Sequence, residues 1–102
     1  MNRGELWWLE EPGGGRRPVC ILTRAEAIPV LRRVTVAPAT RTIRDIPTEV
    51  DLGPEDGLPQ RCVLTLDNVT TVPKALLVDH IATLPQRRLR ELCVALEIAL
   101  GC

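Results

Sequence analysis

The sequence predicts a mostly β fold of the α+β class, in which short strands form one curled sheet and a single helix comes last. Two observations lead to this prediction. Short runs rich in Val, Ile, Leu, Thr and Trp are separated by turn-forming Gly and Pro residues over most of the chain. The last part of the chain instead repeats leucines at helical spacing. With 102 residues, one domain covering residues 1–102 is expected.

Five segments have the composition of strands, and two more are extended candidates. The five are residues 4–9, 17–23, 33–39, 48–52 and 61–66, and the two are residues 69–72 and 77–84. Segment 17–23 is apolar on both faces, which favours a central strand. A glycine-rich loop is expected over 10–16, a single helical turn over 24–31 until Pro29 interrupts it, a polar connection over 40–47 and a turn over 53–59.

The helix is predicted at the end of the chain. Pro85 suits the first helical position and Gly101 a helix end. The apolar stripe between them consists of Leu89, Leu92, Cys93, Leu96 and Leu100. About five to seven strands followed by this amphipathic helix fit a curled antiparallel sheet or a small barrel capped by a helix.

Charge is unevenly distributed although the formal net charge is +0. Residues 12–44 hold seven arginines and one acid, whereas residues 48–79 hold six acids and two bases. A basic segment can attract phosphate, but surface charges that pair with one another are the more common explanation. The bases are twelve arginines and one lysine. Arginine binds phosphate with two parallel bonds, although a GC-rich genome explains its excess equally well.

Several kinds of chemistry are excluded by residue type. His80 is the only histidine and serine is absent, so neither a paired-histidine ribonuclease nor a Ser-His-Asp triad is possible. We expect His80, in an apolar run, to be structural. Cys20, Cys62 and Cys93 lie in apolar runs without metal-ligand spacing and are expected in the core. No metal site or cofactor is predicted. Neither a signal peptide nor a membrane span is recognisable, which favours the cytoplasm and reduced thiols.

Arginine and hydroxyl groups remain as candidates for chemistry. Arg17 lies where the glycine loop meets the predicted central strand, and Thr40 lies where the third strand ends. If these strands are neighbours, both side chains lie at one end of the sheet, where they can bind a phosphate and stabilise charge on it. A solvated arginine at a strand start is the commoner case.

Trp7 and Trp8 are adjacent, so in a strand they face opposite ways. One is expected in the core. The other is exposed, buried in a subunit interface or able to stack on a base, and the interface is favoured.

Several short motifs follow one another in a recognisable order along the chain. They are RGELWW (3–8), GRRPVCILT (15–23), VAPATR (36–41), PTEV (47–50), DNV (67–69) and TVPK (71–74). Their order resembles the MazF/PemK family of bacterial toxins, in particular its short, arginine-rich actinobacterial members. The resemblance covers essentially the whole chain.

The resemblance implies an SH3-like barrel with a C-terminal helix, acting as a homodimeric toxin that arrests growth. It implies metal-independent cleavage of single-stranded RNA, in which the 2′-hydroxyl attacks the adjacent phosphate and leaves a cyclic phosphate and a free 5′-hydroxyl. Arg17 would stabilise the phosphorane and is a candidate proton donor, and Thr40 would hydrogen-bond the phosphate. An assisting acid is Glu10 or Glu11. Candidate RNA contacts are Arg16, Arg41, Arg44 and Asn68. The implied partner is an antitoxin with an acidic, disordered tail.

Two alternatives remain open at this point. One is a CcdB-like toxin of the same fold, which poisons DNA gyrase through its C-terminal residues. That type depends on a Trp-Gly-Ile-like tail, whereas this chain ends Leu100-Gly101-Cys102. The other is a catalytically inert binding module, because an intact arginine and threonine do not prove turnover.

Overall fold

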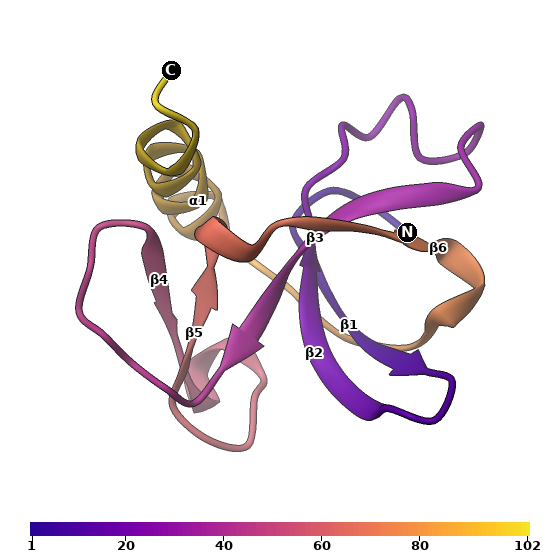
Figure 1. The fold of residues 1–102 in the computed structure, drawn as a ribbon, viewed down its shortest axis with the longest axis horizontal. Coiled ribbons are helices and arrows are strands. Elements are labelled where there is room, and N and C mark those ends of the chain that lie inside the picture. The colour runs from indigo at the N-terminus through magenta and orange to yellow at the C-terminus, as the bar shows by residue number, and fades with distance from the viewer.

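Seven strands, all paired antiparallel, and one C-terminal helix make up the computed structural model, which describes residues 1–102. The fold class expected from the sequence is confirmed, although the curled sheet does not close into a barrel (Figure 1). The strands are β1 (Glu5–Glu11), β2 (Gly15–Ile21), β3 (Arg33–Thr40), β4 (Glu49–Leu52), β5 (Cys62–Thr65), β6 (Thr70–Pro73) and β7 (Leu77–Thr83). Single 3₁₀ turns lie at Pro54–Asp56, Leu66–Asn68 and Lys74–Leu76, and the helix α1 spans Gln86–Leu100.

Strand β3 holds the two parts of the sheet together. The strand order is β4-β5-β3-β2-β1-β7, and β6 also pairs with β3. Along one edge, β3 pairs first with β6, through Arg33–Val36, and then with β5, through Ala39 and Thr40. Figure 1 shows β3 running from the β1, β2 and β6 side of the molecule to the β4, β5 and α1 side. The end of β3 is therefore separated from β2.

Pro38 lies where β3 changes partner. The backbone N–H and C=O of Thr35 both face β2, because its N–H donates to Thr23 Oγ1 and its C=O accepts from Leu22. Backbone groups alternate along a strand, so position 38 faces the opposite edge, between the β6 and β5 pairings. The missing N–H of proline therefore costs no ladder hydrogen bond.

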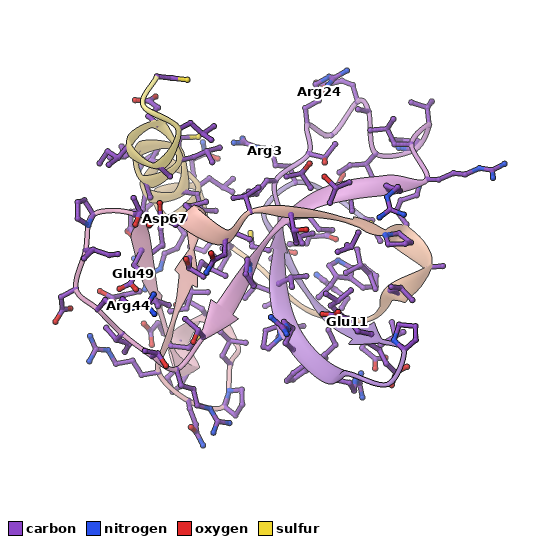
Figure 2. All side chains as sticks on the ribbon, in the orientation of Figure 1. Arg3, Glu11, Arg24, Arg44, Glu49 and Asp67 are labelled. Carbon is purple, nitrogen blue, oxygen red and sulfur yellow. The ribbon has the colours of Figure 1, made fainter.

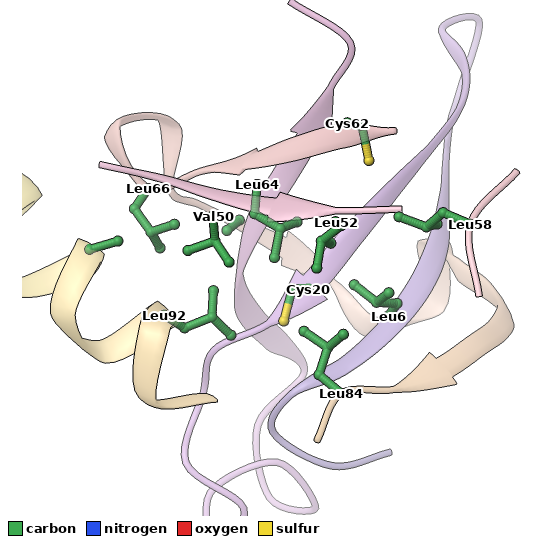
Figure 3. Packing of buried hydrophobic residues seen from close by; sticks show 12 residues of the cluster. Leu6, Cys20, Val50, Leu52, Leu58, Cys62, Leu64, Leu66, Leu84 and Leu92 are labelled. Atoms are coloured by element: carbon green, nitrogen blue, oxygen red, sulfur yellow. The ribbon is translucent and has the colours of Figure 1, made fainter. Parts of the chain in front are cut away.

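The central strands bury both of their faces, as segment 17–23 predicts. Cys20 packs into a cluster with side chains from α1, β4 and β5 (Figure 3), whereas Val19 and Ile21 pack into a second cluster with β3 and β6. All three residues are 0% exposed. β7, in contrast, is an edge strand, and most of its side chains are exposed. His80, for which a structural role is expected, lies on this exposed edge and contacts β1: its ring centroid is 5.3 Å from that of Trp7, and its Nε2 is 4.0 Å from Glu5 Oε1.

The helix begins one residue later than expected, because Pro85 is its N-cap and not its first residue. Gly101 ends it with φ +72°, a left-handed conformation that glycine adopts without strain. Leu92 and Ala95 are buried against the sheet, but Leu100 is 64% exposed and does not belong to the packed stripe. This helix is not long and apolar enough to cross a membrane.

Two loops differ from the sequence-based expectation. Residues 24–31 form successive turns and no helix, since only isolated turn hydrogen bonds such as Ala27 N–H to the Arg24 carbonyl are made. The glycine loop is shorter than residues 10–16, because β1 continues to Glu11 and β2 begins at Gly15. Gly13 and Gly15 have positive φ, which allows the chain to reverse this tightly.

Candidate active site

Arg17 and Thr40 lie across from each other where β2 and β3 separate. The two strands pair as far as Val19 and Pro38. Continuing this register places Arg17 opposite Thr40, on the same face of the sheet, since both lie two residues further along. Here the strands no longer pair, because the end of β3 has joined β5. Both side chains line one cavity of about 600 Å³. The two strands are neighbours, as the sequence argument requires.

Glu11 is the acidic side chain beside Arg17. Its Oε1 lies 3.7 Å from Arg17 Nε, and the two side chains are 47% and 55% exposed. In the β1–β2 register Leu9 is opposite Arg17, so Glu11, two residues further on, is on the same face. Glu10 is opposite Arg16 and therefore faces away. Sequence could not choose between the two acids, whereas the hairpin register places Glu11 next to Arg17.

The candidate RNA contacts line the same cavity. They come from three parts of the chain and are Arg16, Arg41, Arg44 and Asn68. The guanidinium groups of Arg41 and Arg44 form no ion pair, whereas Arg61 and Arg88 are paired with acids elsewhere. The common explanation that surface charges pair with one another therefore holds for some arginines but not for these two. A cavity lined by unpaired arginines attracts an anionic ligand.

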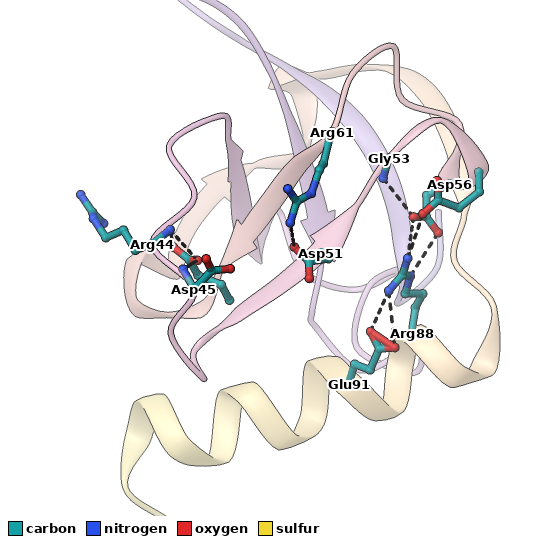
Figure 4. A network of polar contacts seen from close by, with 10 residues as sticks. Arg44, Asp45, Asp51, Gly53, Asp56, Arg61, Arg88 and Glu91 are labelled. Atoms are coloured by element: carbon teal, nitrogen blue, oxygen red, sulfur yellow. Dashed lines mark hydrogen bonds and ion pairs between the residues drawn. The ribbon is translucent and has the colours of Figure 1, made fainter.

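Thr40 and the segment after it are held in place by local hydrogen bonds. The Thr40 hydroxyl oxygen accepts from the Thr42 backbone N–H at 3.2 Å, which leaves its own O–H free to donate. Glu49 Oε1 accepts from the backbone N–H groups of Arg44 and Asp45, at 3.0 and 3.1 Å. Asp45 has φ +54°, so this carboxylate stabilises a left-handed turn that positions Arg44 (Figure 4).

Arg16 has partners that the sequence did not reveal. Its guanidinium forms an ion pair with Asp79 of β7, and its Cζ lies 5.5 Å from the centroid of the Trp8 ring. The ion pair crosses β1, which lies between β2 and β7, and the Trp8 ring belongs to β1 itself. Arg16 is therefore held in a defined position at the edge of the cavity, in contrast to Arg41 and Arg44.

No three His, Cys, Asp or Glu side chains are clustered as metal ligands would be. Cys20 and Cys62 are buried as expected, Cys93 is half-buried and Cys102 is exposed. The groups that line the cavity are thus mainly guanidinium and hydroxyl groups, and the Glu11 carboxylate lies next to them through its ion pair with Arg17. Together they can bind a phosphodiester, accept a proton and stabilise negative charge.

Comparisons with known proteins agree over nearly the whole chain. A probable endoribonuclease MazF5 of Mycobacterium tuberculosis (strain ATCC 25618 / H37Rv) is 48% identical over 101 residues, which cover 98% of this chain and 93% of that protein. A probable endoribonuclease MazF2 of the same species (strain CDC 1551 / Oshkosh) is 39% identical over 103 residues, which cover both proteins completely.

Solved structures give the same result. Mycobacterium tuberculosis toxin MazF-mt6 matches with a TM-score of 0.88 at 35% identity, over 95% of this chain and 96% of that chain. An endoribonuclease in complex with its cognate antitoxin, from a mycobacterial species, also has a TM-score of 0.88, at 29% identity, over 99% and 95% of the two chains. Residues 2–100 match the sequence model described as "PemK-like, MazF-like toxin of type II toxin-antitoxin system". With a match of this extent, the chain belongs to that toxin family.

Proposed function

We propose that this chain is the toxin of a type II toxin–antitoxin pair and a metal-independent endoribonuclease, which cleaves single-stranded RNA in the cytoplasm at a short recognition sequence. The observation that carries the proposal is the convergence of Arg17, Thr40 and Glu11 at the open end of β2 and β3. Relatives over the whole length of the chain are named endoribonucleases, which supports the same assignment.

The proposed reaction is an internal transesterification whose leaving group is the 3′ fragment, which carries the new 5′-hydroxyl. Glu11 accepts the proton of the RNA 2′-hydroxyl, and the 2′ oxygen attacks the neighbouring phosphorus. The bond from phosphorus to the 5′ oxygen breaks, and that oxygen takes up a proton, for which Arg17 is the proposed donor. The products are a 2′,3′-cyclic phosphate and a 5′-hydroxyl. Arg17 stabilises the charge that develops on the phosphorane, and the Thr40 hydroxyl donates to a phosphate oxygen.

Cleavage of a long RNA in the presence of EDTA tests this proposal, with the 5′ ends of the products analysed for hydroxyl groups. Arg17→Ala is expected to reduce the cleavage rate on the order of a hundredfold, because it removes positive charge at the transition state. Arg17→Lys recovers only part of the activity, since an ammonium group cannot contact two phosphate oxygens in a fixed plane. Thr40→Val loses less, because it removes a neutral hydrogen bond.

The matched control is Arg24→Ala. Arg24 carries the same charge but lies on the 24–31 turn, away from Glu11 and Arg44 (Figure 2). Arg16 is unsuitable as a control because it lines the cavity itself. Equal losses in Arg24→Ala and Arg17→Ala would indicate general attraction of RNA and no positioned catalytic group, and full activity of Arg17→Ala would refute the mechanism. A gyrase-dependent DNA cleavage assay tests the CcdB-like alternative separately.

The proposed partners are a second copy of the chain and an antitoxin with an acidic tail that is disordered when free. The cavity with Arg41 and Arg44 is the expected docking surface, because these cations have no internal partner and the tail then competes with RNA. Oppositely charged surfaces associate faster at low salt. The association rate should therefore fall as NaCl is raised, in stopped-flow measurements with the cognate antitoxin. An unchanged rate, or binding without inhibition of cleavage, would contradict this surface.

A further inference from the structure

A second cavity, of about 310 Å³, opens beside the first and has a different character. Both cavities are lined by Arg16, Arg17, Ala39, Thr40 and Arg41. The remaining lining of the second cavity is mainly apolar and comes from Trp8, Pro18, Leu58, Pro59, Gln60 and Cys62. Its volume is at the lower end of the roughly 300–1,000 Å³ that is usual for small-molecule sites. The candidate catalytic pair thus lies between a basic cavity and a small apolar one.

One wall of this cavity presents flat groups. The Arg16 guanidinium lies over the Trp8 ring, with 5.5 Å between Cζ and the ring centroid, and Asp79 fixes it there by an ion pair. Unstacked RNA bases are commonly bound by stacking on aromatic rings and on guanidinium planes. Because strands β1, β2 and β7 supply the three side chains, the stacking surface is formed before any ligand arrives.

Another part of the lining, Leu58–Gln60, follows a segment that is held in place by α1. Arg88 donates to both carboxylate oxygens of the buried Asp56, at 3.3 and 3.1 Å, and Asp56 in turn accepts from the Gly53 N–H (Figure 4). Gly57 follows with φ +91°, and a Cβ at this position would lie 2.9 Å from the Ala82 Cβ. Leu58 is 4% exposed in the core. Gln60, directly after this anchored segment, is exposed to the cavity.

We propose that the second cavity binds the base of the nucleotide adjacent to the scissile phosphate, and that Gln60 determines which base is accepted. This inference rests on the proposed endoribonuclease function. A phosphate at Arg17 and Thr40 places the neighbouring base within reach of the cavity that shares these residues. Gln60 is the only amide side chain in the lining, and an amide offers one donor group and one acceptor group that can pair with a base edge.

Mapping of cleavage sites across a long RNA tests the proposal in the full-length protein. Gln60→Glu and Gln60→Leu are expected to change the preferred base at one position next to the cut, on the order of tenfold, with other positions unchanged. Arg61→Ala is the matched control, because Arg61 is the exposed neighbour, pairs with Asp51 and does not line the cavity. Unchanged preferences in both Gln60 variants would overturn the proposal, and so would a uniform loss of rate at all sites.

A binding measurement separates this inference from the proposed function. In a Trp7→Phe background, Trp8 is the only indole and reports on the cavity. The four nucleoside 5′-monophosphates are expected to quench its fluorescence to different extents, and Gln60→Leu should abolish the difference. Base-dependent quenching without RNA cleavage would refute the endoribonuclease but support the cavity. RNA cleavage without quenching by any of the four nucleotides would refute the base-binding cavity.

Discussion

The buried ion pair between Arg88 and Asp56 connects the helix to the β4–β5 loop, and its loss should destabilise the whole fold. The side chains of Arg88 and Asp56 are 10% and 1% exposed. Arg88 also contacts Glu55 and Glu91, but these two carboxylates are 58% and 43% exposed. Burial lowers the pKa of Arg88, but hydrogen bonds and charge from Asp56 and Glu91 outweigh burial and leave the pKa raised. The perturbation is Arg88→Met, which keeps the volume but removes the charge.

The expected cost follows from the carboxylate that is left behind. Glu55 and Glu91 can turn to solvent, so their pairs contribute little. The buried Asp56 cannot turn to solvent, and a buried charge whose partner is removed costs about 3–5 kcal/mol. In a chain of this size each kcal/mol corresponds to roughly 4–8 °C in Tm. Arg88→Met should therefore lower Tm by at least about 12 °C. Arg87→Met removes only the exposed pair with Glu91 and should cost about 0.3–0.5 kcal/mol.

Urea denaturation measures the differences in free energy of unfolding, and thermal unfolding measures the change in Tm. Both need one fixed protein concentration, since dimerisation would make the midpoint depend on concentration. Arg88→Met combined with Asp56→Leu should recover most of the lost stability, because a buried pair replaced by apolar residues is often neutral. It should still lack about 1 kcal/mol for the Gly53 N–H, whose acceptor Asp56 is then missing. If Arg88→Met costs less than about 1 kcal/mol, or the double variant is no more stable than the single one, the reasoning is refuted.

Three further predictions concern thiols, acid stability and assembly. Burial raises the pKa of Cys20 to about 12, against the lowering effect of Arg3. At pH 8, iodoacetamide should therefore modify the exposed Cys102 but not Cys20. Mass spectrometry of samples treated with and without urea would show this difference. The free energy of unfolding should also fall as pH rises above 9, because the Cys20 thiol ionises at a lower pH in the unfolded chain than in the folded protein. Burial raises the pKa of Glu5, but the hydrogen bond from the Trp7 indole N–H and other contacts leave this pKa lowered below 4.5. The stability that ionised Glu5 contributes is therefore complete above its pKa in the unfolded chain and is lost as pH falls through its pKa in the folded protein. Glu5→Gln should reduce the difference in urea midpoint between pH 7 and pH 3. Sedimentation at micromolar concentration should show a homodimer, and a monomer alone would contradict that expectation.

Local patterns in the sequence determined the elements and their kinds. An apolar run such as 17–23 can be stable only with both faces covered, so its central place follows from its residues alone. Gly101 adopts the left-handed conformation that ends the helix, and the residue type alone predicts this helix end. Arg17 and Thr40 could be selected because each lies at the end of a predicted strand. Their selection needed only strand boundaries and the assumption that the two strands are neighbours.

Tertiary structure decided which groups meet, because pairing register depends on every strand at once. Glu11, and not Glu10, lies beside Arg17 only because Leu9 is opposite Arg17 in the hairpin. Arg16 and Asp79 are 63 residues apart in sequence and meet because β1 lies between their strands. A shift of one residue in register would turn each of these side chains to the other face of the sheet. The sequence by itself thus determined the elements and the candidate residues, and the assembled sheet decided how they are arranged around the two cavities.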